Sequence, residues 1–156
     1  MNKIQIIKGI LLAMIIAFLA ANVIQPSDSN LKMSTVQDVT LKKVDMKNLT
    51  KQNNQDIKRF LGLQPGDYKE IVYYKHNDTM QSPEVLIVKF TNHSQQKAFV
   101  ETMKKHRDER KGVFDGYAPK EAQLLSDSIT TVHANYAIFI VHKDAKTINK
   151  QFLSNF

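Results

Sequence analysis

The chain of 156 residues contains no cysteine. That absence excludes a disulfide framework, a thiol nucleophile, a thiolate metal site and a lipid attached to an N-terminal cysteine. Glycine is also scarce, and the five glycines are scattered at positions that suit caps and turns, which excludes a glycine-rich phosphate loop. A domain without disulfides must be held together by its apolar core, and the chain is long enough for one such domain.

Catalytic motifs are missing as well. The five histidines form no His-x-x-x-His pair, and no Gly-x-Ser-x-Gly nucleophile elbow occurs. We therefore assign no catalytic, metal-binding or cofactor-binding residue, and we expect no cofactor. One weak candidate is Glu84, an acid that opens an apolar run. Its ordinary interpretation is an exposed residue at the start of a strand, or a salt bridge to Lys89.

The N-terminus has no acidic residue before Asp28. Lys3 and Lys8 precede an uncharged run over residues 9–25, a pattern typical of an export signal or a membrane anchor. Extended back to Ile4, the run reaches about 20 residues, enough for one membrane span. We predict a transmembrane helix that contacts the membrane through residues 4–24, with the N-terminus in the cytoplasm and the rest outside.

Two fates of this segment stay open. Cleavage after Ala20 or Ala21 would place Phe18 or Leu19 where a signal peptidase wants a small residue, so we favour a retained single-pass anchor in the cell membrane. Secretion after cleavage is the alternative. The predicted organisation is a signal-anchor or signal peptide over 1–25, a polar tether over 26–33, and one extracytoplasmic domain over 34–156.

The charge balance is basic. Lys and Arg number 22 against 15 Asp and Glu, a net charge of +7, of which +5 remains without Lys3 and Lys8. Outside a cell this charge favours anionic wall polymer or lipid head groups, and the competing interpretation is that the charge serves simple solubility. No motif indicates nucleic acid. The candidates for binding an anionic surface are Lys104, Lys105, Arg107, Arg110 and Lys111. The competing interpretation is a solvated helix face whose acidic residues pair with these cations.

Periodicity and turn residues predict an α+β fold. We expect four strands in a mostly antiparallel sheet, with helices packed on one face. The strands are predicted over 68–75, 84–91, 128–133 and 136–142. Helices are predicted after Ser34, from Thr50 to a cap at Gly62, from Asn92 to Gly112, over 121–125, and after Asp144. In the last hairpin Ala134-Asn135 forms the turn, since Asn tolerates positive φ.

Several of these segments resemble a known bacterial family. The segments are Glu84–Lys89, the charged helix after it, Gly116-Tyr117-Ala118-Pro119, and the Asn135-Tyr136 hairpin with its apolar return strand. Together they are similar to the domain-of-unknown-function family 4358 (DUF4358), over roughly residues 34–152. The resemblance implies an exported domain that is anchored or lipid-linked. It implies no activity and no functional residue, and without the lipidation cysteine of many members it favours a membrane helix.

These observations lead to three hypotheses. The first is a non-enzymatic interaction module at the cell envelope, binding a protein, wall polymer or membrane surface. The second is a small exported hydrolase, or an accessory subunit of an envelope enzyme complex, that uses Glu84. A deep pocket that holds Glu84 beside a His or Tyr would favour this second hypothesis. The third is a structural partner within a larger envelope complex.

Overall fold

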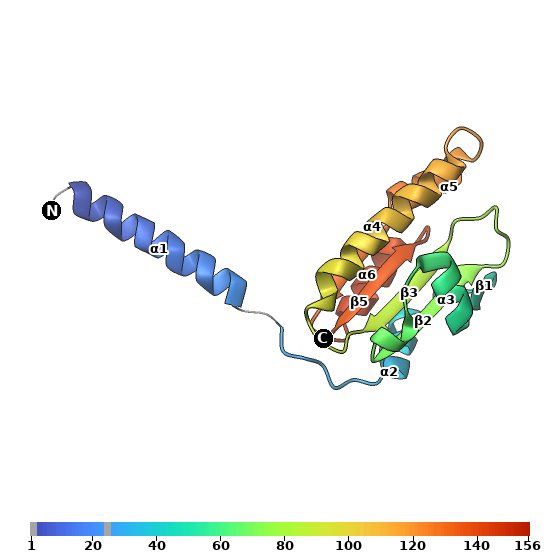
Figure 1. Cartoon of the computed structure of the whole chain (residues 1–156), viewed down its shortest axis with the longest axis horizontal. Helices are drawn as coiled ribbons and strands as arrows, with labels where there is room; N and C mark the ends of the chain where they lie inside the picture. Colours follow the sequence, from blue (N-terminus) through green and yellow to red (C-terminus); the bar gives the residue numbers. More distant parts are fainter. Residues whose placement is uncertain (1–2, 24–25) are drawn as a thin grey trace.

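The computed structural model describes residues 3–23 and 26–156. An N-terminal helix is followed by one domain in which helices and strands alternate (Figure 1). The strands are β1 (Leu49–Lys51), β2 (Glu70–His76), β3 (Glu84–Lys89), β4 (Ile129–His133) and β5 (Tyr136–Val141). The helices are α1 (Lys3–Val23), α2 (Met33–Thr40), α3 (Asn54–Leu61), the 3-10 turn η1 (Pro65–Asp67), α4 (Gln95–Phe114), α5 (Pro119–Ser126) and α6 (Ala145–Leu153).

The strands form one antiparallel sheet in the order β1-β2-β3-β5-β4. The α+β class and the antiparallel sheet are confirmed, but the sheet has five strands and not the predicted four. The additional strand β1 has three residues and pairs along the edge from Leu49↔His76 to Lys51↔Tyr74. It escaped prediction because a three-residue strand shows no alternation, and because Thr50 looked like a helix cap.

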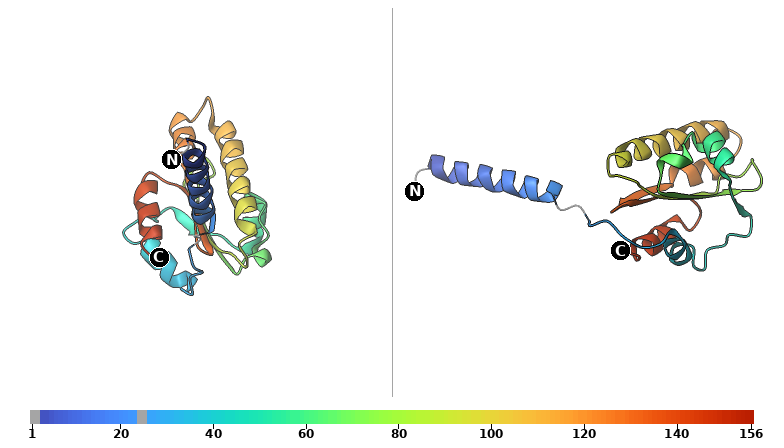
Figure 2. Two further views of the ribbon diagram at one scale, coloured as in Figure 1. Left: turned by 90° about the vertical axis from the view of Figure 1, so that its left-hand side faces the viewer. Right: turned by 60° about the horizontal axis from the view of Figure 1, so that its bottom comes forward.

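Helices cover both faces of the sheet, which corrects the prediction of one covered face (Figure 2). Helices α3, α4 and α5 pack on one face, and α2 and α6 pack on the other. The reason lies in the two central strands, since every residue of β3 and β5 is buried. Successive side chains of a strand point to opposite faces, so two continuous apolar strands need a cover on each side.

Helix α3 begins and ends as its sequence requires. The Asn53 side chain accepts hydrogen bonds from the backbone N–H groups of Gln55 and Asp56, so Asn53 and not Thr50 is the cap. The predicted left-handed cap at Gly62 is present, with φ of 67°. Helix α4 continues past the predicted end at Gly112 because Phe114 is buried on the sheet and holds the last turn in place.

Helix α1 lies apart from the sheet and its covering helices (Figures 1 and 2). We predicted that this segment crosses a membrane. Across residues 3–23 and 26–156, however, no helix combines the length and the apolar character that a membrane crossing needs. The predicted N-terminal transmembrane helix is therefore corrected to an α-helix that does not meet this criterion.

Residues 28–31, here called the strap, are held against the domain. The Asn135 side chain accepts a hydrogen bond from Ser29 N at 2.9 Å and donates one to Ser29 O at 3.1 Å. The Leu31 carbonyl accepts hydrogen bonds from Lys89 Nζ and Tyr136 Oη, both at 2.7 Å. These residues lie within the segment predicted as a tether, and their backbone is bound to the β4–β5 hairpin and β3.

The hairpin turn explains why Asn135 is free to hold the strap. The left-handed residue is Ala134, with φ of 51°, and not the Asn that the sequence suggested for that conformation. The turn therefore does not need Asn135 to adopt a left-handed backbone conformation. Its side chain instead matches a peptide group, because an amide offers one acceptor and one donor.

Candidate functional site

A buried carboxylate lies at the start of β3. Glu84 is fully buried and faces the helices of the α4 side. One carboxylate oxygen accepts hydrogen bonds from His106 Nε2 at 2.9 Å and Arg110 at 2.7 Å. The other oxygen accepts the Tyr73 hydroxyl at 2.5 Å. We call these four residues the Glu84 centre.

The electrostatics of the Glu84 centre keep the carboxylate ionised. Burial alone would raise the pKa of Glu84, but its hydrogen bond to His106, the nearby charges of His106 and Arg110, and the Tyr73 hydroxyl together lower that pKa to about 2. Burial and the adjacent carboxylate raise the pKa of Tyr73 well above its ordinary value, so Tyr73 stays a hydrogen-bond donor. A carboxylate that is ionised and hydrogen-bonded at both oxygens is a weak base and a weak nucleophile.

His106 has a defined tautomer in this arrangement. An ionised carboxylate only accepts hydrogen bonds, so the Nε2 atom that faces Glu84 carries a proton. Nδ1 has no hydrogen-bond partner within the described part of the chain. His106 also lines a cavity of about 350 Å³ between α3 and α4. The Glu84 centre therefore reaches a cavity through His106, although Glu84 itself does not line it.

The hydrolase hypothesis is met only in part. His106 and Tyr73 do lie beside Glu84, as that hypothesis required. Glu84 is nevertheless fully buried, and none of the pockets described for residues 3–23 and 26–156 has Glu84 in its wall. In these same ranges, no group of three or more His, Asp or Glu is placed to hold a metal ion.

The predicted anionic-surface residues separate into two groups. Arg110 pairs with Glu84, Arg107 with Asp108 at 2.7 Å, and Lys105 with Glu109 at 3.7 Å. Lys104 and Lys111 are exposed and make no ion pair with any described residue. The structure thus directs Arg110 into the Glu84 centre and leaves the other four on the outer side of α4, where Asp108 and Glu109 pair with two of them.

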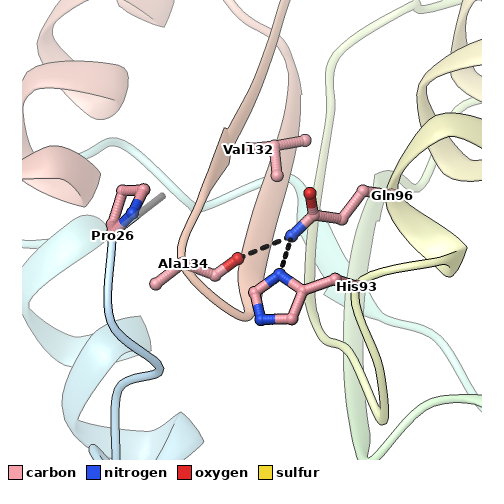
Figure 3. A pocket seen from close by; sticks show the side chains of 5 residues that line it. All are labelled: Pro26, His93, Gln96, Val132 and Ala134. Atoms are coloured by element: carbon pink, nitrogen blue, oxygen red, sulfur yellow. Dashed lines mark hydrogen bonds between the residues drawn. The ribbon is translucent and has the colours of Figure 1, made fainter. Parts of the chain in front are cut away.

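A second feature is a groove along the free edge of β4. Gln96 and Val132 are shared by two adjoining pockets of about 250 and 380 Å³. The first is also lined by Pro26, His93 and Ala134 (Figure 3), and the second by Lys97, Val100 and Glu101. Gln96 donates hydrogen bonds to the Ala134 carbonyl at 2.8 Å and toward His93 Nδ1 at 2.9 Å (Figure 3). We call this surface the edge groove.

The backbone of β4 presents unpaired groups to the edge groove. β4 is the last strand of the sheet and pairs only with β5. His133 and Tyr136 flank a two-residue turn and form a hydrogen-bonded pair, so in the alternating ladder Thr131 bonds to β5 as well. Thr130 and Val132 therefore point their N–H and C=O groups outward. Their side chains lie on the α4 face of the sheet, beside the half-exposed Val100.

One signal in the sequence could have revealed the Glu84 centre. The buried stripe of α4 runs through Phe99, Met103 and Phe114 at helical spacing. His106 and Arg110 fall on that same stripe, which places a histidine and an arginine on the side that packs against the sheet. Polar side chains at core positions need buried partners, and Glu84 at the start of an apolar strand is the matching acid.

A comparison with known protein families shows which family the chain belongs to. The family described as "Domain of unknown function (DUF4358)" matches residues 42–142. The chain belongs to this family. The resemblance drawn from the sequence is thus confirmed, over a shorter span than 34–152. Neither the curated proteins nor the solved structures that were compared with the chain contain a match.

The match places the DUF4358 domain on the structure. Residues 42–142 contain all five strands together with α3, α4 and α5, and so contain the Glu84 centre and every lining residue of the edge groove except Pro26. The strap and α6 lie outside the matched range. The DUF4358 match therefore covers both features described above and assigns neither of them a chemical role.

Proposed function

We propose that the chain is an interaction module of the cell envelope that binds an extended peptide segment of a partner protein in the edge groove. The observation that carries this proposal is the free edge of β4, whose outward backbone groups at Thr130 and Val132 lie beside a half-apolar groove. A strand edge with unpaired N–H and C=O groups is a template for another strand. Backbone hydrogen bonds do not distinguish one peptide sequence from another, whereas the adjoining groove can select among the side chains of the bound peptide.

The chemistry of the groove defines the partner. A peptide strand added to β4 would place alternate side chains on the α4 face, against Val100 and Val132. Lys97 and Glu101 border the same space with opposite charges. The partner segment is therefore extended, carries an apolar residue at the centre, and has polar or charged residues beside it. Binding of this kind needs no reaction at Glu84.

Edge pairing is tested by removing one outward N–H group. We expect Thr130→Pro to weaken binding of peptides selected on the wild-type chain at least about tenfold, because proline cannot donate the hydrogen bond that a docked strand needs. Thr130→Val keeps the N–H group and is the matched control, with affinity close to wild type. Affinities are measured by calorimetry, and circular dichroism reports the fold of both variants.

Two outcomes contradict the peptide proposal. One is a set of selected peptides that bind Thr130→Pro as tightly as the wild-type chain. The other is a selection from a library of extended heptapeptides that yields no peptide competing for the groove. Binding to anionic wall polymer or lipid vesicles through Lys104 and Lys111, unaffected by Thr130→Pro, would assign the module to a polymer or membrane surface instead.

We also propose that the module works outside the cytoplasm, delivered to the membrane by residues 4–24. The support is the basic head at Lys3 and Lys8 and the uncharged run that follows. A reporter enzyme that is active only after export, fused behind Phe156, is expected to be active. The same fusion without residues 1–25 is expected to be inactive, and equal activity of the two fusions would refute export by this segment.

A further inference from the structure

The cavity between α3 and α4 has a distinctive wall. Its volume is about 350 Å³, within the range of sites for small molecules. One side comes from the end of α3 and its cap, and the other from the middle of α4. The lining residues used below are Arg59, Phe60, Thr102, Lys105, His106 and Glu109. The peptide proposal uses none of the residues that line this cavity.

A buried lysine lies behind the cavity wall. Lys75 is 8% exposed and stands directly opposite Glu84 in the β2–β3 register. Its Nζ atom lies 5.0 Å from the centre of the Phe60 ring, and the guanidinium of Arg59 lies 4.4 Å from the same ring. Within the described residues, Nζ makes no hydrogen bond and no ion pair. The direct contact given for Nζ is therefore with the face of the Phe60 ring, while Glu84 stands across from Lys75 on the next strand.

Lys75 shares its nearest buried acid with two other groups. That acid is Glu84, and the other groups beside it are Arg110, whose side chain is 16% exposed, and the buried His106. Glu84 is already bonded to Arg110 and His106. The outer acids are engaged too, because Asp56 pairs with Arg59 at 2.8 Å and Glu109 with Lys105 at 3.7 Å. Among the described residues, no acid therefore forms a direct ion pair with Lys75.

The pKa of Lys75 is lowered by its surroundings. Desolvation by burial lowers the pKa of Lys75, and the charge of Arg110 lowers it further, against opposing contributions of Glu84 and Asp78. A buried cation without a partner is unfavourable, and an anion close to it relieves that penalty. The adjacent cavity brings Arg59, Lys105 and His106 to the same place.

We infer that the α3–α4 cavity binds a small ligand with an oxyanion, a carboxylate or a phosphate. The outer cations Arg59 and Lys105 contact the oxyanion, the buried amine of Lys75 adds positive charge behind the Phe60 ring, and the exposed part of the Phe60 ring packs against the apolar part of the ligand. The anion-binding role that the sequence suggested for the whole basic run is thereby assigned to this cavity, in which Lys105 alone of the five predicted cations takes part.

The inference is tested with three probes on the full-length chain: inorganic phosphate, phenyl phosphate and phenylacetate. We expect a saturable shift of the His106 ring and Thr102 amide NMR signals, with phenyl compounds binding more tightly than inorganic phosphate. Comparison of phenyl phosphate with phenylacetate distinguishes phosphate from carboxylate. Lys75→Met should weaken binding about tenfold or more while keeping the buried stem, and Lys104→Met on the exposed face should not change it.

Stability measurements show whether a loss of binding in a variant comes from unfolding. Because Lys75→Met removes an unpaired buried charge, its melting temperature should equal or exceed that of the wild-type chain. Thr102→Phe leaves every charge in place but fills the cavity, so it should also abolish the shifts. A wild-type chain that gives no saturable shift with any of the three probes overturns the inference. Unchanged affinity in Lys75→Met, or in folded Thr102→Phe, overturns it as well.

Discussion

Glu84→Gln is expected to lower the free energy of unfolding by about 3 kcal/mol at neutral pH. The pKa of Glu84 falls from 4.5 to about 2 in the folded chain, and each unit of such a shift corresponds to about 1.36 kcal/mol. Glutamine is similar in shape but neutral, so it leaves Arg110 buried without a counter-charge. Urea unfolding followed by far-ultraviolet circular dichroism measures the difference, and suits a chain without tryptophan.

The same contribution should depend on pH in a defined window. The pKa of Glu84 is depressed on folding, so the stabilisation is fully present above about pH 4.5 and is lost as the pH falls toward about 2. The stability of the wild-type chain should therefore drop toward that of Glu84→Gln across this window. Below it, the two proteins should unfold at similar urea concentrations.

An exposed acid on α4 is the control for this prediction. Glu109 is exposed and, among the described residues, pairs with Lys105 alone, so Glu109→Gln should change stability by no more than about 0.5 kcal/mol at any pH. If the difference between wild type and Glu84→Gln stayed constant from pH 5 to pH 2, the charge of Glu84 would not be the source of its effect.

Phe152→Ala is expected to cost about 3–5 kcal/mol. Phe152 lies on α6, is fully buried against the second face of the sheet, and packs edge-on against Phe156. Its removal loses the transfer free energy of a large side chain and leaves a cavity. An effect of this size shows that the α6 face is a true core rather than a lightly covered surface. Urea unfolding again gives the value.

The neighbouring residue of the same helix provides the matched comparison. Leu153 is 41% exposed, so Leu153→Ala should cost less than about 1 kcal/mol. Nearly equal losses in the two variants would mean that α6 contributes through its helical backbone and not through burial of Phe152. A loss below about 1 kcal/mol in Phe152→Ala would contradict the two-sided core.

Elements with a strong local signal could be predicted. The continuous apolar runs of β3 and β5 indicated the centre of a sheet, and both strands lie there with every residue buried. The Gly62 cap and the two-residue hairpin turn also follow from local backbone preferences. β1 could not be predicted, because three residues owe their strand conformation to pairing with β2 and not to their own pattern.

The candidate sites were less accessible to prediction. Glu84 was recognised as unusual, but its expected partner Lys89 proved to hold the Leu31 carbonyl of the strap instead. The sequence analysis places Arg110 on an exposed basic face because a run of charged residues usually lies in solvent. The 3.6-residue spacing of α4 instead places Arg110 on the side with Phe99 and Met103, which packs on the sheet. The edge groove had no sequence signal at all, since it depends on which strand ends the sheet.

The sequence by itself determined the chemistry that is excluded, the family, the class of fold and most elements. These follow from composition and from periodicities within a few residues, which act before any tertiary contact forms. Only the tertiary structure decided that Tyr73, Glu84, His106 and Arg110 form one centre and that Lys75 is buried beside it without a direct ion pair among the described residues. These residues come from two strands and a helix, and their pairing arises because packing removes each of them from water, where an unpaired charge is costly.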